Sequence, residues 1–337
     1  MEEPAAGWLP RNGIRRSLGI VVLNYALYAA LRLAAWALQF VPIGIVYAAA
    51  RCVGWCAYYV VLGARRSITA NLAVVMGMPG EQPKVRHAAR HAFQHDAMNW
   101  IDTLRISRLS PSEILDMVHV DEWQLLEDTV REGRGVVLVT LHLGNYDLVG
   151  QVLVARGYQL TVAVEHMEPA RLFDFLMSQR TSKGINAVPI EHAPRELIRA
   201  LRAGEIVGLA GDRNIVGRVL SVQMFGRQAD LPLGPVSLAR HTGANVLLGV
   251  GIRTRSGGFQ GKVRRIPLVH TDDAEADDAR NLSTLAAEME NLIGCFPDQW
   301  LAFRPFWANH GASATATMRQ QNRAILHSAG RDAHVDR

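Results

Sequence analysis

Near the centre of the chain stands the apolar run Gly135-Val136-Val137-Leu138-Val139-Thr140. The run is short, rich in β-branched residues and led by glycine, which is typical of a strand that is buried on both faces of a sheet. Residues 145–156 then have the pattern of a helix, and Gly157 marks its end. A strand followed at once by a helix is the building unit of a parallel α/β sheet.

From about residue 130 onward, the rest of the chain alternates in the same way between strand and helix patterns. This βαβα order predicts an α/β fold with a mainly parallel central sheet flanked by helices. We expect strands at residues 159–165, 187–190, 205–210, 245–252 and 260–269, an edge strand at 221–225, and helices at 168–183, 194–203, 235–241 and 273–292.

The N-terminal region is apolar, because only Arg32 and Arg51 are charged between residues 18 and 64. These arginines divide it into runs at or below the length that spans a bilayer, and Pro42 interrupts the middle run. Either one or two helices enter the membrane, or the helices lie along its surface. A buried helical layer is the soluble alternative. Basic residues flank both ends, which favours a hairpin or an in-plane helix over a single span.

The apolar region runs far beyond the length of a signal peptide and shows no small-residue cleavage site, so the pair Arg15-Arg16 does not indicate export. Residues 311–337 are polar, alanine-rich and unpatterned. We therefore divide the chain into a membrane-associating helical region at 1–66, an α/β domain at 67–310 and a disordered tail at 311–337.

The composition limits the classes of binding partner and the cellular compartment that we expect. Hydrophobic residues make up 49% of the chain, the formal net charge is +5, and the pI is about 9.4. A basic excess of this size suits anionic lipid headgroups, phosphorylated substrates or nucleic acid. No basic-aromatic module is evident, so nucleic acid is not an expected partner. The three cysteines cannot all pair within one chain, and we interpret all three as reduced core thiols of a cytosol-facing protein.

The carboxyl end of the central strand carries the candidate site. Open α/β sheets bind ligands at this edge, and His142 lies two residues past the strand. Asn145 is suited to cap the next helix, which places Asp147 in the first helical turn. Histidine and aspartate at this spacing can touch only if the loop folds back onto the helix. Because a histidine held by a carboxylate is a general base, we expect His142 and Asp147 to be catalytic.

The residue types in this segment also suggest the reaction. No serine or cysteine is present to act as a nucleophile, so the base would activate a hydroxyl of the substrate, and direct transfer from an acyl thioester is the natural reaction. Backbone N–H groups at the start of the next helix can stabilise an oxyanion. The alternative is structural. Asn145 and Asp147 also suit a helix N-terminus, and His142 can be a satisfied core histidine.

Residues 140–150, which include His142 and Asp147, resemble the lysophospholipid acyltransferase superfamily with its signature His-x4-Asp/Glu. Over residues 20–307 the chain is similar to the lipid A biosynthesis acyltransferases and to actinobacterial enzymes that acylate phosphatidylinositol mannosides. Further elements agree in order: Arg65-Arg66…Asn71-Leu72, Glu165, Gly211-Asp212-Arg213, Phe225-Gly226, Leu231-Pro232-Leu233-Gly234-Pro235, Thr242-Gly243-Ala244, Pro297-Asp298-Gln299-Trp300 and Pro305-Phe306-Trp307.

This resemblance implies a glycerolphosphate-acyltransferase-like fold and an acyltransferase at the cytoplasmic face of a bacterial inner membrane. The donor would be acyl-CoA or acyl-ACP. The acceptor would be a hydroxyl of a membrane glycolipid or phospholipid, of lipid A type or phosphatidylinositol mannoside type, and no cofactor or metal is expected. Asp147 stands where the lipid A branch usually has glutamate, and with the region from Trp300 to Trp307 it favours the mannoside branch.

Four residues are candidates for substrate binding. Glu165, where the mannoside enzymes carry a glutamate implicated at the active site, can contact the acceptor or orient His142; otherwise it is a solvated acid that closes a strand. Arg213 can hold a phosphate of the donor or headgroup, unless it pairs with the adjacent Asp212, for which the same two roles are open. Asn145 completes the set, although shaping the loop is its simpler role.

Two other functions stay open on the sequence alone. One is a catalytically inactive membrane component that has kept the fold, although the intact His142 and Asp147 argue against it. The other is a metal-dependent hydrolase that would add His87, His91 and His95, which share one helical face. No further ligand is evident for such a site, so a polar helix face is the simpler interpretation of the three histidines.

Overall fold

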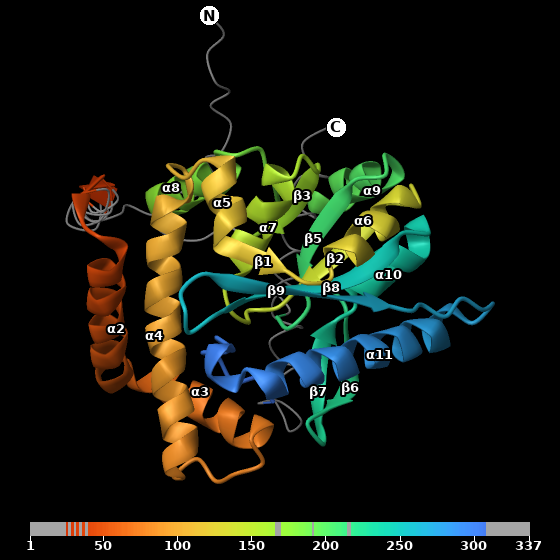
Figure 1. Ribbon diagram of the computed structural model, residues 1–337. Coiled ribbons are helices and arrows are strands. Elements are labelled where there is room, and N and C mark those ends of the chain that lie inside the picture. Colours follow the sequence, from red (N-terminus) through yellow and green to blue (C-terminus); the bar gives the residue numbers. More distant parts are fainter. Residues whose placement is uncertain are drawn as a thin grey trace, which may run out of the picture.

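The run at residues 136–140 is a strand, β2, at the centre of a seven-stranded sheet (Figure 1). The computed structural model describes residues 40–165, 170–190, 192–213 and 217–307, together with Tyr25, Tyr28, Ala29, Arg32, Leu33, Trp36 and Ala37. The strand order is β1-β9-β8-β2-β5-β3-β4. The strands are β1 (Val118–Val120), β2 (Val136–Thr140), β3 (Leu160–Val164), β4 (Asn186–Pro189), β5 (Ile206–Ala210), β8 (Asn245–Arg253) and β9 (Phe259–Ile266).

Five strands of the sheet run parallel, so the predicted α/β fold with a mainly parallel sheet is confirmed. Strand β2 pairs in parallel with β5 on one side and β8 on the other, and β3 pairs in parallel with both β5 and β4. The exception is β9, which follows β8 as an antiparallel neighbour and carries the short strand β1 in parallel at the edge.

The burial of β2 on both faces explains its apolar sequence. Val137 and Val139 belong to the core shared with α9, α10 and α11, whereas Val136 and Leu138 belong to the core shared with α6 and α7. Side chains alternate along a strand, so each face needs its own apolar set. The helices are α5 (Pro111–Met117), α6 (Trp123–Arg131), α7 (Tyr146–Ala155), α8 (Ala170–Thr181), α9 (Ala193–Arg202), α10 (Gly234–Thr242) and α11 (Ala274–Cys295).

The edge strand predicted at 221–225 is a strand, but not of the main sheet. Strand β6 (Val219–Met224) pairs antiparallel with β7 (Arg227–Pro232) in a separate two-stranded sheet. Phe225 and Gly226, which join them, both have positive φ, at 51° and 69°. A two-residue turn of this kind folds a strand straight back on the next one, so β6 pairs locally and not with the central sheet.

Helices of the N-terminal region lie against one side of the α/β domain (Figure 1). Helix α2 (Ile43–Val60) runs along the long helix α4 (Pro83–Ile106), and α3 (Leu62–Val75) connects them. At Gly54, an added Cβ would lie 2.5 Å from the carbonyl oxygen of Phe93, so glycine permits the close approach of α2 to α4.

Helix α2 is long and apolar enough, by length and composition, to cross a membrane, and it is the one such helix among the described residues. Only 22% of it is buried, which leaves large apolar side chains such as Val53, Trp55 and Val60 exposed. Its cysteines Cys52 and Cys56 are free and exposed, as is Cys295, so the prediction of core thiols was wrong about their burial. A core helix of a soluble protein would be mostly buried. The predicted boundary between the N-terminal helical region and the α/β domain, after residue 66, falls inside helix α3. The tail predicted at 311–337 lies outside the described residues.

Candidate active site

The loop after β2 carries His142 and is held by backbone hydrogen bonds to two distant segments. The N–H of Gly144 donates to the carbonyl oxygen of Gln299 at 3.0 Å, and the N–H of Asn145 donates to that of Gly251 at 2.8 Å. Gly144 has φ of 68°, and a Cβ there would lie 2.1 Å from the Gly251 oxygen. Only glycine therefore fits at this position, and the loop is rigidly placed.

A buried carboxylate from the neighbouring strand holds the imidazole of His142. Nδ1 of the ring lies 2.8 Å from Oδ1 of Asp212, and the backbone N–H of His142 donates to Oδ2 at 3.0 Å. The indole N–H of Trp300 donates to the same Oδ2 at 2.9 Å. Only 2% of the Asp212 side chain is exposed, against 25% for His142. Asp212 follows β5, which pairs with β2, so two parallel carboxyl ends create this contact.

Burial and charge oppose each other in this pair. Burial favours the neutral acid of Asp212, but the charge of His142 and the hydrogen bonds from His142 and Trp300 outweigh it and lower the pKa of the carboxyl. Burial also disfavours the imidazolium, but the charge and hydrogen bond of Asp212 outweigh it and raise the pKa of His142 above 6.5. With Nδ1 held by a carboxylate, Nε2 is the nitrogen that can act as a base.

Asp147 forms a different ion pair, with Arg180 of α8. Nε of Arg180 donates to Oδ1 at 2.7 Å, and Nη2 donates to Oδ2 at 3.3 Å. The Thr103 hydroxyl donates to Oδ2 at 3.1 Å. Across the described residues no hydrogen bond joins Asp147 to His142, so the predicted contact between these two side chains was wrong. The reason is geometric, because the first turn of α7 directs Asp147 to α4 and α8 while His142 faces β5.

Glu165 and Arg213 pair with each other. Nη2 of Arg213 lies 3.0 Å from Oε2 of Glu165, and about a third of each side chain is exposed. The alternative pair between Arg213 and Asp212 does not form, because the oxygens of Asp212 are occupied by His142 and Trp300. Glu165 and Arg213 line the same cavity as the histidine, where a charged substrate group can reach them.

Asn145 caps α7, as its sequence position predicts, and is buried. Its Oδ1 accepts from the N–H of Leu148 at 3.1 Å, and its Nδ2 donates to Asp102 of α4 at 2.9 Å. Asp102 is in turn held by Arg253 of β8 and by the Tyr47 hydroxyl of α2. All polar atoms of the Asn145 side chain thus have protein partners, and this buried network ties the loop to the scaffold.

Sequence reasoning missed three residues of the site. Asp102 and Arg253 brace the loop, and Arg180 neutralises Asp147. Their partners lie more than thirty residues away in the chain, so no local sequence pattern predicts these contacts and only the fold identifies the three residues.

A cavity of about 290 Å³ opens beside His142 and extends along the sheet. Its polar lining includes His142, Asp147, Glu165 and Arg213, and Tyr146 lies next to the histidine with ring centroids 5.1 Å apart. Such a size is at the lower limit for a ligand pocket. Helix α4 adds Asp96, Asn99, Trp100 and Thr103 to the lining. The apolar lining comes from β2, β3, β5, α7, α8 and the loops next to them: Leu138, Leu141, Val149, Leu160, Val162, Ala163, Val164, Leu176, Ile185, Leu209 and Ala210.

The residues that the structure describes contain no group of three or more histidine, cysteine or carboxylate side chains that could hold a metal. Of the three histidines on α4, His91 lies 3.5 Å from Asp298 and stacks against His87, with ring centroids 4.1 Å apart. None of the three lines the cavity beside His142. The metal-dependent hydrolase therefore has no assembled ligand set in the described part of the chain.

The chain is similar to known bacterial acyltransferases. The family model described as bacterial lipid A biosynthesis acyltransferase matches residues 16–309. A phosphatidylinositol mannoside acyltransferase of Mycobacterium tuberculosis H37Rv is 27% identical over 274 residues, which cover 78% of this chain and 84% of the relative. A phosphatidylinositol mannoside acyltransferase of Mycolicibacterium smegmatis is 26% identical over 254 residues, covering 73% of this chain and 80% of the relative.

Proposed function

Because this chain belongs to the family of bacterial lipid A biosynthesis acyltransferases, it is an acyltransferase for lipid-type acceptors, and we propose that His142 and Asp212 form its catalytic pair. The observation that carries this proposal is the hydrogen bond that Nδ1 of His142, which lines a largely apolar cavity, donates to the buried carboxylate of Asp212. The donor would be an acyl thioester, acyl-CoA or acyl-ACP. The acceptor would be a hydroxyl of a membrane glycolipid.

In the proposed step, Nε2 of His142 takes the proton of the acceptor hydroxyl while the hydroxyl oxygen attacks the carbonyl carbon of the thioester. The C–O bond forms, the C–S bond breaks, and the leaving thiolate receives the proton from the imidazolium. Asp212 stabilises the imidazolium while it exists. We assign the oxyanion to the backbone N–H groups at the start of α7, which follows the loop that carries His142.

We assign Asp147 a positioning role at the same site. Its pair with Arg180 joins α7 to α8, and these two helices contribute residues to one wall of the cavity. A charged pair that is mostly buried fixes the relative position of its two elements, because separating the charges leaves each one without compensation. Loss of Asp147 would therefore disturb the wall beside His142.

Glu165 and Arg213 are proposed to bind the polar part of a substrate. They are the most exposed charged pair of the cavity. A substrate can therefore replace one partner of this pair without leaving a fully buried charge unpaired. A guanidinium binds phosphate oxygens in pairs, which suits a phosphate of the donor or of the acceptor headgroup. The apolar lining suits the acyl chain.

The names of the mycobacterial relatives support an acceptor of the phosphatidylinositol mannoside type. The exposed apolar surface of α2 supports attachment of the enzyme to a membrane, with the 1–66 region as the attached part. We propose the cytoplasmic face of the inner membrane, where acyl thioesters are present. An acceptor of this kind would then present its hydroxyl groups at the surface on which the enzyme sits.

The experiment is an acyl-transfer assay with purified full-length protein, acyl-CoA or acyl-ACP, and a phosphatidylinositol mannoside in mixed micelles. We expect acylated lipid from the wild-type protein and none from His142→Ala. The matched control is His91→Ala, a half-exposed histidine of α4, which should keep full activity.

Transfer by His142→Ala at the wild-type rate would contradict the mechanism. If the wild-type protein shows no transfer and no slow thioester hydrolysis with any lipid, the result would instead favour the catalytically inactive membrane component. Loss of activity with a chelator would favour the metal-dependent hydrolase.

A further inference from the structure

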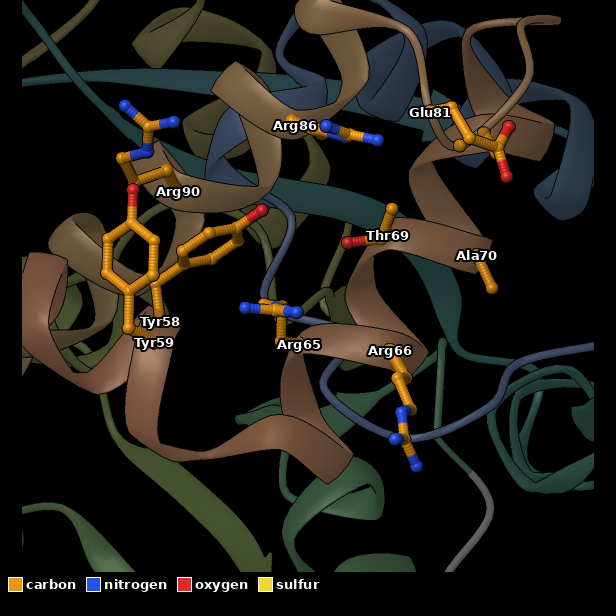
Figure 2. Close-up of a pocket in the computed structure, with 11 residues that line it drawn as sticks. Tyr58, Tyr59, Arg65, Arg66, Thr69, Ala70, Glu81, Arg86 and Arg90 are labelled. Carbon is orange, nitrogen blue, oxygen red and sulfur yellow. The ribbon is translucent and has the colours of Figure 1, made fainter.

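A second pocket, distinct from the cavity beside His142, lies where α2, α3 and α4 meet (Figure 2). Its volume is about 690 Å³. The end of α2 contributes Tyr58 and Tyr59, and the other charged and polar lining residues are Arg65, Arg66, Thr69, Glu81, Arg86 and Arg90. None of these residues lines the catalytic cavity. The pocket is therefore a separate feature that the proposed reaction does not use.

The arginines of this pocket lack carboxylate partners. Within the described residues, no ion pair involves Arg65, Arg66, Arg86 or Arg90, whereas arginines such as those at positions 180, 240 and 253 are each paired. Nε of Arg90 is buried and has no hydrogen-bond partner. One carboxylate, Glu81, lines the pocket, and Figure 2 shows it on the opposite side from Arg90. The pocket therefore carries an excess of positive charge with unused donors.

Two of the guanidinium groups are held in place by an aromatic ring. The guanidinium carbon of Arg65 lies 5.4 Å from the ring centroid of Tyr58, and that of Arg90 lies 5.7 Å from the same centroid. Tyr58 is itself buried, with 5% of its surface exposed. Contact with an aromatic face restrains a guanidinium without using its N–H groups. The N–H donors remain available to an anion, and phosphate oxygens match them in geometry.

Next to this charged pocket runs an apolar groove of about 700 Å³ between α2 and α4. Tyr58 of the charged pocket packs against Phe93 of the groove, with ring centroids 5.7 Å apart, so the groove adjoins the charged pocket there. Asp96 and Trp100 line both this groove and the cavity beside His142. The adjoining surface of α2 exposes large apolar side chains, among them Val53, Trp55 and Val60. Phosphate-binding donors beside an apolar groove match a molecule that has a phosphate group at one end and hydrocarbon at the other.

We propose that this pocket binds the phosphate of an anionic membrane phospholipid, whose acyl chains lie in the groove between α2 and α4. Such a lipid would fix the depth and orientation of α2 at the membrane surface. The site would be occupied by a bound lipid and not by the acyl donor. It goes beyond the proposed function, and it holds whether or not the protein transfers acyl groups.

The test measures lipid retention by full-length protein in neutral detergent micelles that contain equal amounts of dioleoyl phosphatidylglycerol and dioleoyl phosphatidylcholine. Native mass spectrometry then counts the lipid that stays bound. We expect at least a fivefold preference for phosphatidylglycerol in the wild-type protein. The double variant Arg65→Gln with Arg90→Gln should lose this preference.

The matched control is Arg131→Gln with Arg199→Gln, which removes the same charge from exposed positions on α6 and α9 and should keep the preference. If the pocket variant does not fold, Arg86→Gln, at an exposed position, replaces it and should lower the preference at least twofold. Equal preference in the pocket variant and the wild-type protein would overturn the proposal. Displacement of the lipid by glycerol phosphate or CoA at equal concentration would also overturn it, because the pocket would then prefer a soluble phosphate.

Discussion

Oδ1 of Asp212 lies 2.8 Å from Nδ1 of His142, although 70 positions separate the two residues in the chain. The carboxylate also accepts hydrogen bonds from the backbone of His142 and from the indole of Trp300. Every described partner of this carboxylate thus either belongs to the histidine or supports its position. Asp212 is therefore the residue whose change should affect the chemistry most directly after His142 itself.

Replacing Asp212 by asparagine should lower kcat by about 10²–10⁴-fold. The amide keeps the shape of the side chain but can neither stabilise an imidazolium nor impose the same tautomer. The measurement is steady-state acyl transfer by the purified variant, with thermal unfolding as a check on folding. Asp128→Asn, on the exposed surface of α6, is the control and should be fully active. An Asp212→Asn enzyme with more than a tenth of wild-type kcat would count against the pair.

The pH profile should follow the raised pKa of His142. Asp212 keeps the imidazole protonated above its ordinary pKa of 6.5, and a protonated ring is no base. The acid limb of kcat/KM should therefore have its midpoint above pH 6.5, with activity rising as pH increases through it. In Asp212→Asn, burial acts without the charge that opposes it, so the midpoint should move to lower pH. A midpoint that stays in place would show that another group controls the limb.

Asp147 and Arg180 should behave as one unit. Because both side chains are mostly buried, removing either charge leaves the other without a partner and should destabilise the protein by about 1–3 kcal/mol. Asp147→Asn and Arg180→Gln should each reduce activity, and the double variant should lose little more than either alone. A double-mutant cycle on kcat/KM and on unfolding measures this coupling. Losses that simply add would mean that Asp147 acts on the reaction independently of Arg180.

Gly144→Ala should destabilise the loop and abolish activity. Its φ of 68° disfavours alanine, and the new Cβ would meet the Gly251 oxygen at 2.1 Å, so we expect a loss of more than about 2 kcal/mol. The measurement is thermal unfolding in detergent together with the transfer assay. Gly63→Ala is the control, because an added Cβ on that helical residue meets nothing within 4 Å. It should be neutral or slightly stabilising, whereas equal behaviour of the two variants would refute the argument.

Enlarging Val162 should shorten the acyl chain that the enzyme accepts. Val162 lines the apolar part of the cavity from β3, so Val162→Phe fills space that the end of a long chain would use. We expect a preference for shorter acyl donors that changes by roughly tenfold, comparable to the cost of overpacking a site. A series of acyl-CoA substrates of increasing length measures it. An unchanged length profile would place the acyl chain elsewhere.

The sequence predicted much of the fold but not the pairing of side chains. The apolar run at 136–140 is enough to identify the central strand, and Asn145 is enough to identify the start of α7. The edge strand predicted at 221–225 forms, but its partner β7 was not predicted, because the turn at Phe225 and Gly226 sets that pairing. The sequence identified Asp212 as a candidate site residue, but its partner is His142 and not the adjacent Arg213.

Burial, capping and turns depend on neighbouring residues, so the sequence by itself determined that His142 follows a buried strand and that Asp147 lies in the first turn of a helix. Which carboxylate meets the imidazole depends on which strands lie side by side, and only the tertiary structure decided that. Because β5 pairs with β2, the carboxylate after β5 reaches Nδ1, while the one on α7 is drawn to Arg180.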